Sequence, residues 1–220
     1  MGVVVTWAEY CVAWARLHGG FDPSGASPLV RGWVLIAYRM GSWLGRKRVG
    51  PTAVTTAGLI VCWGVPLAVI IGRPGLVLAG VLVLLAALAD GLDGAVAVVT
   101  GRASRLGYVY DSVADRLGEA AWLLAFWLAG APGWLVVTAG AVSWLHEYAR
   151  ARATAAGMTE IGAVTVAERP TRVLIAIFGL LLTFFSGLVI TVAAGLWLAL
   201  AVVGLAQLGV AIRRALSSDR

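Results

Sequence analysis

The sequence predicts an all-α integral membrane protein with six transmembrane helices, preceded by an amphipathic helix in the membrane interface. Three observations support this fold class. The chain has 220 residues, of which 60% are hydrophobic, and a mean hydropathy of +0.91, whereas a soluble domain is roughly 45–50% apolar. Its apolar stretches approach the roughly 20 residues that a helix needs to cross a bilayer. Basic residues gather at alternate ends of these stretches, as in multi-pass membrane proteins.

The first 50 residues are too short or too charged in their apolar parts to cross a membrane. Residues 1–26 form an N-terminal extension whose apolar stretch, 3–17, contains charges, and a linker rich in small and polar residues follows at 19–27. Residues 27–50 mix Arg31, Arg39 and the basic run 46–48 with tryptophan and aliphatic residues. This mixture is typical of a helix that lies in the plane of the interface.

The transmembrane domain is predicted at 51–216, followed by a short tail at 217–220. The turns "GRP", "TGRASR" and "APG" and a polar loop at 156–169 separate most of the apolar stretches. The predicted spans are 53–71, 74–99, 107–130, 134–155, 170–191 and 195–214.

The positions of the basic residues predict the orientation. An even number of spans puts both termini on one side, and that side then holds nearly all arginine and lysine residues, whereas the outer loops hold only Arg73. Under the positive-inside rule, both termini are therefore expected on the cytoplasmic side of the membrane. The membrane is expected to be the plasma membrane, with the active site facing the cytoplasm. The net charge of +6 then reflects topology and contact with anionic headgroups, and does not predict nucleic-acid binding.

Four aspartates lie at the cytoplasmic ends of the second and third predicted spans. Asp90 and Asp93 are three residues apart and share one helix face, while Gly107, Asp111 and Asp115 follow each other at intervals of four. Because a short turn joins the two helices, they are antiparallel neighbours. The two acidic faces are therefore expected to converge.

Converging carboxylates in a low-dielectric environment repel each other unless a cation lies between them. Carboxylate oxygens suit Mg²⁺ or Mn²⁺, and four of them suit two such ions. Two alternatives stay open. A single aspartate near a helix end, such as Asp115 beside Arg116, can belong to a surface pair. Buried carboxylates also mark the ion paths of transporters and channels, although here they cluster at one end of the helices.

The spacing Asp90-x2-Asp93-Gly94-x2-Ala97-x9-Gly107-x3-Asp111-x3-Asp115 resembles the signature of the CDP-alcohol phosphotransferase family. The resemblance implies six spans, a preceding amphipathic helix and a homodimer. It also implies transfer of a phosphatidyl group from CDP-diacylglycerol to an alcohol, with release of CMP. By this resemblance, Asp90, Asp93 and Asp111 are the main metal ligands, and Asp115 is the general base and a further metal ligand.

The resemblance places the cytidine contacts near Gly94, Ala97 and Gly107. The family usually has an arginine where this chain has Val98, so Arg102 or Arg105 in the following turn is expected to supply that positive charge. Before the first span, Pro51-Thr52-x2-Thr55 resembles the family's Pro-Asn-x2-Thr, with Thr52 in place of asparagine. A degenerate, non-catalytic family member is the alternative that Val98 leaves open.

The segments 147–157 and 167–172 resemble the actinobacterial phosphatidylinositol phosphate synthase branch of the family. That resemblance implies a phosphorylated acceptor, with inositol phosphate as the first candidate and glycerol 3-phosphate as the alternative. Two residues depart from the branch: Glu147 replaces a small hydroxyl residue, and Leu208 stands where an arginine is expected. The same basic residues also fit a purely topological flank. The residues expected to bind the acceptor are Arg150, Arg152, Arg169 and Arg172.

Overall fold

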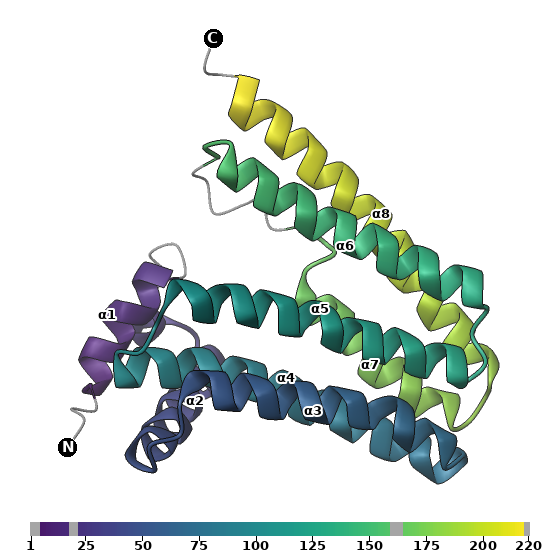
Figure 1. Ribbon diagram of the computed structural model, residues 1–220, viewed down its shortest axis with the longest axis horizontal. Coiled ribbons are helices and arrows are strands. Elements are labelled where there is room, and N and C mark those ends of the chain that lie inside the picture. Colours follow the sequence, from purple (N-terminus) through teal and green to yellow (C-terminus); the bar gives the residue numbers. More distant parts are fainter. Residues whose placement is uncertain (1–4, 18–21, 159–164, 218–220) are drawn as a thin grey trace. The chain divides into compact units, whose positions relative to one another are not determined.

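The computed structural model describes residues 5–17, 22–158 and 165–217 (Figure 1). Helices are the only regular elements of this part of the chain, which confirms the predicted all-α class. The predicted linker at 19–27, the loop at 156–169 and the tail at 217–220 lie partly outside the described residues. The elements are α1 (Trp7–Leu17), η1 (Pro23–Gly25), α2 (Pro28–Arg46), α3 (Pro51–Ile70), α4 (Arg73–Thr100), α5 (Arg105–Leu128), α6 (Gly133–Ala155), α7 (Arg169–Thr183) and α8 (Leu188–Ser217).

Helices α3 to α8 correspond in order to the six predicted spans, but the predicted boundary between the fifth and the sixth is wrong. The fifth span was expected to reach residue 191, whereas α7 ends at Thr183 and α8 already begins at Leu188. The chain turns between them through 184–187, which ends in Ser186 and Gly187. Phe184 and Phe185 precede these two residues and continue the apolar stretch, so the sequence does not indicate a turn at this point.

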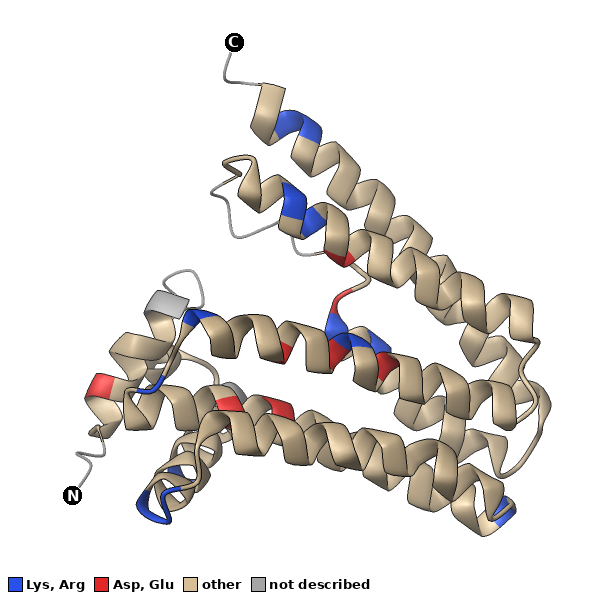
Figure 2. Cartoon of the chain, viewed as in Figure 1, with Lys and Arg blue, Asp and Glu red and all other residues tan. Residues whose placement is uncertain are grey.

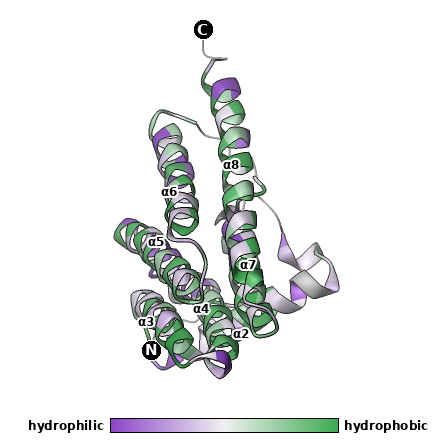
Figure 3. Ribbon diagram, turned by 90° about the vertical axis from the view of Figure 1, so that its right-hand side faces the viewer, coloured by the Kyte–Doolittle hydropathy of each residue, from purple (hydrophilic) through white to green (hydrophobic). Residues whose placement is uncertain are grey.

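In the described part of the chain, three helices are long and apolar enough to cross a membrane: α3, α4 and α8. Charged side chains interrupt α5 and α6, and α7 has only 15 residues, or about 22 Å of helix against a hydrocarbon core of roughly 30 Å. The count of six spans therefore stays a prediction. Hydrophobic residues make up most of α3, α4 and α8 (Figure 3), as expected for helices in contact with lipid.

The chain forms two compact units, of which the first comprises residues 1–60 and 85–115. In this unit α1 and α2 pack on the second half of α4, where Tyr10, Val34, Ala95 and Val99 form a buried hydrophobic cluster. A Cβ atom on Gly41 of α2 would lie only 3.2 Å from the Cβ of Ala95. Glycine therefore allows α2 to approach the helix that carries Asp90 and Asp93.

The second unit comprises residues 61–84 and 116–220. Helix α8 packs along both α6 and α7. The indole of Trp197, 1% exposed, donates a hydrogen bond of 3.0 Å to the hydroxyl of Ser143 on α6. Gly179 of α7 lies so close to α8 that an added Cβ would be 2.8 Å from the Cβ of Ala193. These close contacts hold α6, α7 and α8 together. The start of α7 carries a charged network described below.

Candidate functional site

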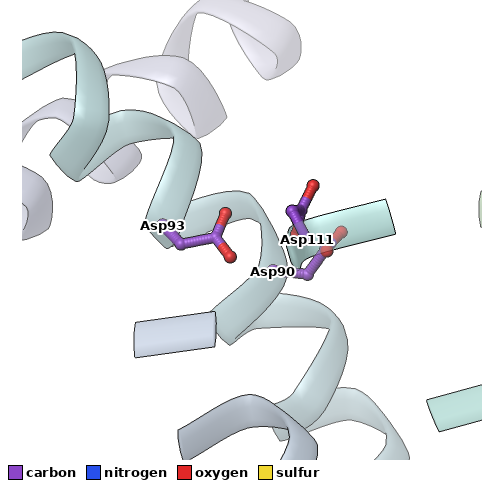
Figure 4. Close-up of side chains that lie close together, drawn as sticks. All are labelled: Asp90, Asp93 and Asp111. Atoms are coloured by element: carbon purple, nitrogen blue, oxygen red, sulfur yellow. The ribbon is translucent and has the colours of Figure 1, made fainter. Parts of the chain in front are cut away.

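Three of the four predicted aspartates come together in the first unit. Asp90 and Asp93 project from α4 and Asp111 from α5, and one carboxylate oxygen of each lies within 4.8 Å of the others (Figure 4). Asp93 is only 6% exposed, and the other two side chains are half-buried. We call these three residues the aspartate cluster. It matches the convergence predicted from the spacing on two antiparallel helices.

Thr55 of α3 fixes the orientation of the most buried member. Its hydroxyl oxygen lies 2.6 Å from Oδ2 of Asp93 and 3.1 Å from the carbonyl oxygen of Pro51. Because one hydroxyl donates only one proton, the shorter contact with the charged carboxylate is the stronger hydrogen bond. Thr55 thus orients a candidate metal ligand through a hydrogen bond, as residues next to metal ligands commonly do.

Asp115 lies four residues beyond Asp111 on α5 and is half-buried. It is not a member of the aspartate cluster, whose ligand atoms come from three residues only. Convergence is therefore observed for three of the four carboxylates, and the convergence of Asp115 with them stays a prediction. The role of Asp115 as general base stays a prediction.

The chemistry of the aspartate cluster fits a hard divalent cation. Three carboxylates at this separation repel one another, and a cation between them removes the repulsion. Oxygen ligands from aspartate suit Mg²⁺ and Mn²⁺, which keep water or substrate oxygens in their remaining positions. The cluster offers ligands for one such ion. The predicted second ion needs further donors, for which Asp115 is the nearest candidate along the sequence.

A cavity of about 430 Å³ opens beside the aspartate cluster, and we call it the donor cavity. Asp93 and Asp111 lie in its wall. Apart from its chain neighbours and the backbone of its own helix, a Cβ atom added to Gly94 would meet no atom of the described residues within 4 Å. This glycine therefore leaves space in the wall of the cavity. All residues predicted to contact the donor nucleotide line it: Thr52, Thr55, Gly94, Ala97, Arg102, Arg105 and Gly107.

The structure gives a physical reason for Val98 in place of the family's arginine. Val98 packs against the hydrophobic cluster formed by α1, α2 and α4, where an arginine would put a charge among apolar side chains. Arg102 and Arg105, in the turn that follows α4 and at the start of α5, line the donor cavity instead. The cavity therefore keeps positive charge in its wall although the motif arginine is missing.

In the second unit, two arginines and two glutamates alternate in a closed set, which we call the charged ring. Arg172 of α7 donates to Glu119 of α5 at 2.8 and 3.1 Å and to Oε1 of Glu147 of α6 at 2.8 Å. Arg116 of α5 lies 3.0 Å from Glu119 and 3.1 Å from the same Oε1 of Glu147. Two positive and two negative charges leave the ring neutral, and Figure 2 shows acidic and basic residues together on α5.

Burial differs strongly around the charged ring. The side chains of Glu119 and Arg172 are 1% and 2% exposed, whereas those of Arg116 and Glu147 are 18% and 28% exposed. His146, beside Glu147 on α6, is fully buried, and its Nε2 lies 3.2 Å from the hydroxyl of Thr165. This histidine is thus a hydrogen-bonded interior residue.

Arg150 of α6 forms a separate pair with Glu168, the residue before α7. Its two terminal nitrogens donate to the two carboxylate oxygens at 2.5 and 3.1 Å, and the backbone N–H and hydroxyl of Thr165 donate to the same carboxylate. Burial raises the pKa of Glu168, but the hydrogen bonds from Arg150 and Thr165 outweigh it and hold the pKa below its usual value.

The four predicted acceptor residues thus have different surroundings. Arg172 belongs to the charged ring and Arg150 to the pair with Glu168, whereas Arg152 is exposed on the last turn of α6 and Arg169 is half-buried at the start of α7. Sequence reasoning missed Glu119. Its position in a run of small and apolar residues, three residues after Arg116, was the available signal.

Comparison with known proteins agrees with this geometry. The family model of CDP-alcohol phosphatidyltransferase matches residues 48–208. The chain is 38% identical over 100 residues to archaetidylinositol phosphate synthase of Pyrococcus horikoshii, covering 45% of this chain and 53% of that protein. It is 39% identical over 100 residues to phosphatidylinositol phosphate synthase of Mycolicibacterium smegmatis, covering 42% and 44%. The matches therefore span about half the length of these curated relatives.

Solved structures share the fold over a larger part of the chain. Phosphatidylinositol phosphate synthase of Mycobacterium tuberculosis with CDP-DAG bound matches with a TM-score of 0.71 at 23% identity, covering 84% of this chain and 97% of that one. The same enzyme in complex with manganese and citrate matches with a TM-score of 0.68 at 22% identity, covering 84% and 92%. With the fold shared and the family model matching most of its length, this chain belongs to the CDP-alcohol phosphatidyltransferase family.

Proposed function

We propose that this protein transfers a phosphatidyl group from CDP-diacylglycerol to a phosphorylated alcohol, with inositol phosphate as the first candidate, and releases CMP. One observation carries the proposal. The cavity that all seven predicted donor residues line also has Asp93 and Asp111 of the aspartate cluster in its wall. The residues predicted to contact the nucleotide and two of the candidate metal ligands therefore line one cavity in the first unit.

The donor side of the reaction follows from the donor cavity. Asp90, Asp93 and Asp111 would hold the divalent ion, Mg²⁺ or Mn²⁺, and a bound ion would neutralise the diphosphate of the donor. Gly94 leaves room for the nucleotide. Arg102 and Arg105 lie in the cavity wall. Each guanidinium group can donate two hydrogen bonds to phosphate oxygens in a geometry that lysine does not offer.

The acceptor hydroxyl attacks the phosphorus of the phosphatidyl group, the bond from that phosphorus to the CMP oxygen breaks, and CMP leaves. We assign the role of accepting the hydroxyl proton to Asp115. Its carboxylate lies outside the aspartate cluster and is therefore available as general base. The acceptor's phosphate is assigned to the arginines of the second unit, Arg150, Arg152, Arg169 and Arg172. Arginine forks bind phosphate through charge-assisted hydrogen bonds.

The names of the relatives support a phosphorylated polyol as acceptor, since the proteins that match are an archaetidylinositol phosphate synthase and phosphatidylinositol phosphate synthases. Glu147 and Leu208 depart from that branch, so glycerol 3-phosphate, which would give phosphatidylglycerol phosphate, is the second candidate acceptor. We further propose a homodimer in the plasma membrane, with the donor cavity and both termini on the cytoplasmic side. The positive-inside distribution of arginine and lysine supports this orientation.

Purified protein in a neutral detergent tests the reaction. CDP-diacylglycerol is supplied with inositol phosphate, glycerol 3-phosphate, free inositol or glycerol, and both CMP and the mass of the lipid product are measured. We expect CMP release only with a phosphorylated alcohol, and its loss when EDTA removes divalent ions. Absence of CMP release with every acceptor would support a non-catalytic family member. A preference for free inositol or glycerol would refute the acceptor assignment.

Arg150 provides a second test of the acceptor side. Its pair with Glu168 is partly exposed, so an alanine at this position should leave the fold intact. Loss of one arginine fork should raise the acceptor KM about 10-fold or more, because each charge-assisted hydrogen bond contributes roughly 1.5–3 kcal/mol, and the donor KM should hardly change. Arg73→Ala is a control, since this arginine contacts the carbonyl oxygen of Phe184. An unchanged acceptor KM in Arg150→Ala would leave this arginine a purely topological role.

A further inference from the structure

The charged ring contains a carboxylate that phosphate could replace. Oε1 of Glu147 lies 2.8 Å from a terminal nitrogen of Arg172 and 3.1 Å from one of Arg116. A single anionic oxygen thus bridges two guanidinium groups, which is also how phosphate oxygens bind between arginines. The arginines keep a second carboxylate partner, Glu119, on their buried side.

Exposure separates the two carboxylates. The side chain of Glu119 is 1% exposed and that of Glu147 is 28% exposed, so solvent reaches the ring on the side of Glu147. The side chain of Arg116 is 18% exposed as well, so a soluble anion that approaches the ring meets Glu147 and Arg116 before it reaches Glu119. Removal of Glu147 from the ring would change its net charge from zero to +1, and a bound anion would restore the balance.

Arg172 also has an unused donor. Among the described residues, its buried Nε–H has no hydrogen-bond acceptor, although both terminal nitrogens are occupied. A buried donor without an acceptor is unfavourable, and a carboxylate that offers one oxygen to the ring does not satisfy it. A phosphate has more oxygens than the single one that Glu147 places between the arginines.

We propose that Glu147 holds the place of the acceptor's phosphate between Arg116 and Arg172, and that a soluble phosphate monoester binds by displacing it. This inference rests on the proposed function for the identity of the ligand, but not on the transfer reaction itself. Glu147 is then a specificity-determining residue. It keeps the arginines paired without a ligand and weakens binding of every anion that cannot replace it.

Binding of inorganic phosphate tests the displacement directly. The full chain in a neutral detergent, without CDP-diacylglycerol or anionic lipid, is titrated with phosphate against chloride at equal ionic strength. Glu147→Gln should bind phosphate at least about 10-fold more tightly than wild type, because removal of a competing charge in contact with a cation commonly shifts an equilibrium by one to three powers of ten. An unchanged phosphate affinity in this variant would overturn the proposal.

Two matched variants separate displacement from general electrostatics. Glu119→Gln makes the same change of charge next to the same arginines but leaves Glu147 in place, so its phosphate affinity should rise less than about threefold. Glu9→Gln changes an exposed glutamate at the start of α1, which pairs with Thr6, and should have no effect. An equal gain in Glu119→Gln and Glu147→Gln would overturn the displacement mechanism.

Carboxyl footprinting of the wild-type protein decides the matter if a variant does not fold. Carbodiimide labelling of each acidic residue is followed by mass spectrometry with and without phosphate. Displacement predicts that phosphate increases labelling of Glu147 at least twofold and leaves Glu119 unlabelled. Constant labelling of Glu147 under phosphate concentrations that bind would refute the proposal. Displacement without phosphatidyl transfer would refute the proposed function alone, and transfer without displacement would refute this inference alone.

Discussion

The aspartate cluster and the charged ring are both sets of ionisable side chains on membrane-type helices, yet their charge balance differs. The cluster gathers three carboxyl groups whose ligand atoms lie within 4.8 Å of one another, whereas the ring alternates two arginines and two glutamates at 2.8–3.1 Å. A balanced set stabilises helix packing without any ligand. A set of one sign requires a counter-ion, so its presence in a low-dielectric region indicates binding.

The largest expected effect tests whether Asp115 differs in role from the cluster beside it. Asp115→Asn should lower turnover at least about 10²-fold, the usual scale of general base catalysis, while binding of Mn²⁺ and of the donor largely survives. Asp111→Asn is the matched control on the same helix and should lose both turnover and Mn²⁺ affinity. Near-normal turnover in Asp115→Asn would remove this residue from the role of base. A parallel loss of Mn²⁺ binding would make it a ligand.

The next effect tests the structural character of the charged ring. Arg172→Ala leaves Glu119 and Glu147 with one arginine between them, and breaking such a buried pair commonly costs about 3–5 kcal/mol. Thermal unfolding in detergent, followed by tryptophan fluorescence, should show a large fall in the midpoint. Arg150→Ala, which breaks a more exposed pair, should cost about 1 kcal/mol or less. Similar midpoints for the two variants would contradict the distinction between them.

A smaller effect concerns the support behind the aspartate cluster. Thr55→Val keeps the shape of the side chain but removes the hydroxyl that lies 2.6 Å from Asp93. Loss of a residue that orients a metal ligand commonly lowers metal affinity about 10–100-fold, which titration with Mn²⁺ would measure. Thr56→Val is the control, because its hydroxyl contacts Tyr110 and the carbonyl oxygen of Thr52. Equal Mn²⁺ affinity in wild type and Thr55→Val would argue against Asp93 as an oriented ligand.

The smallest effect is the acid sensitivity of the pair between Arg150 and Glu168. The pKa of Glu168 lies below its usual value in the folded protein, whereas in the unfolded chain it is about 4.3. The pair therefore stabilises the fold fully above the unfolded pKa and loses this contribution as the pH falls through the folded pKa. Unfolding midpoints from pH 7 to pH 3 should fall slightly more for wild type than for Glu168→Gln. Parallel curves would show that the pair does not stabilise the fold.

Local spacing explains what the sequence could predict. The aspartate cluster depends on intervals of three and four residues on two helices joined by a short turn, so its convergence follows from helix geometry. Gly94, Ala97 and Gly107 of the donor cavity belong to the same motif, whereas Thr52 and Thr55 belong to a second short motif before the first span. Both sets were predicted from the resemblance to the family. The partners of the arginines were not, because Glu119, Glu147 and Arg172 lie on three helices and meet only through tertiary packing. Likewise, Val98 packs against a hydrophobic cluster to which Tyr10 of α1 contributes. The apolar stretch of α1 does not by itself predict where that helix lies or what it contacts.

Substitutions at Gly94 would show how closely a ligand approaches the wall of the donor cavity. Outside its chain neighbours and its own helix backbone, a methyl group at Gly94 meets no described atom within 4 Å. Because the backbone there is also helical, the folded chain should accept alanine or serine. Any loss of binding would then measure a collision with the bound molecule and not a defect of the protein. Larger side chains at this one position should therefore favour donor analogues from which a matching group has been removed. The wild-type protein should show no preference for these smaller analogues.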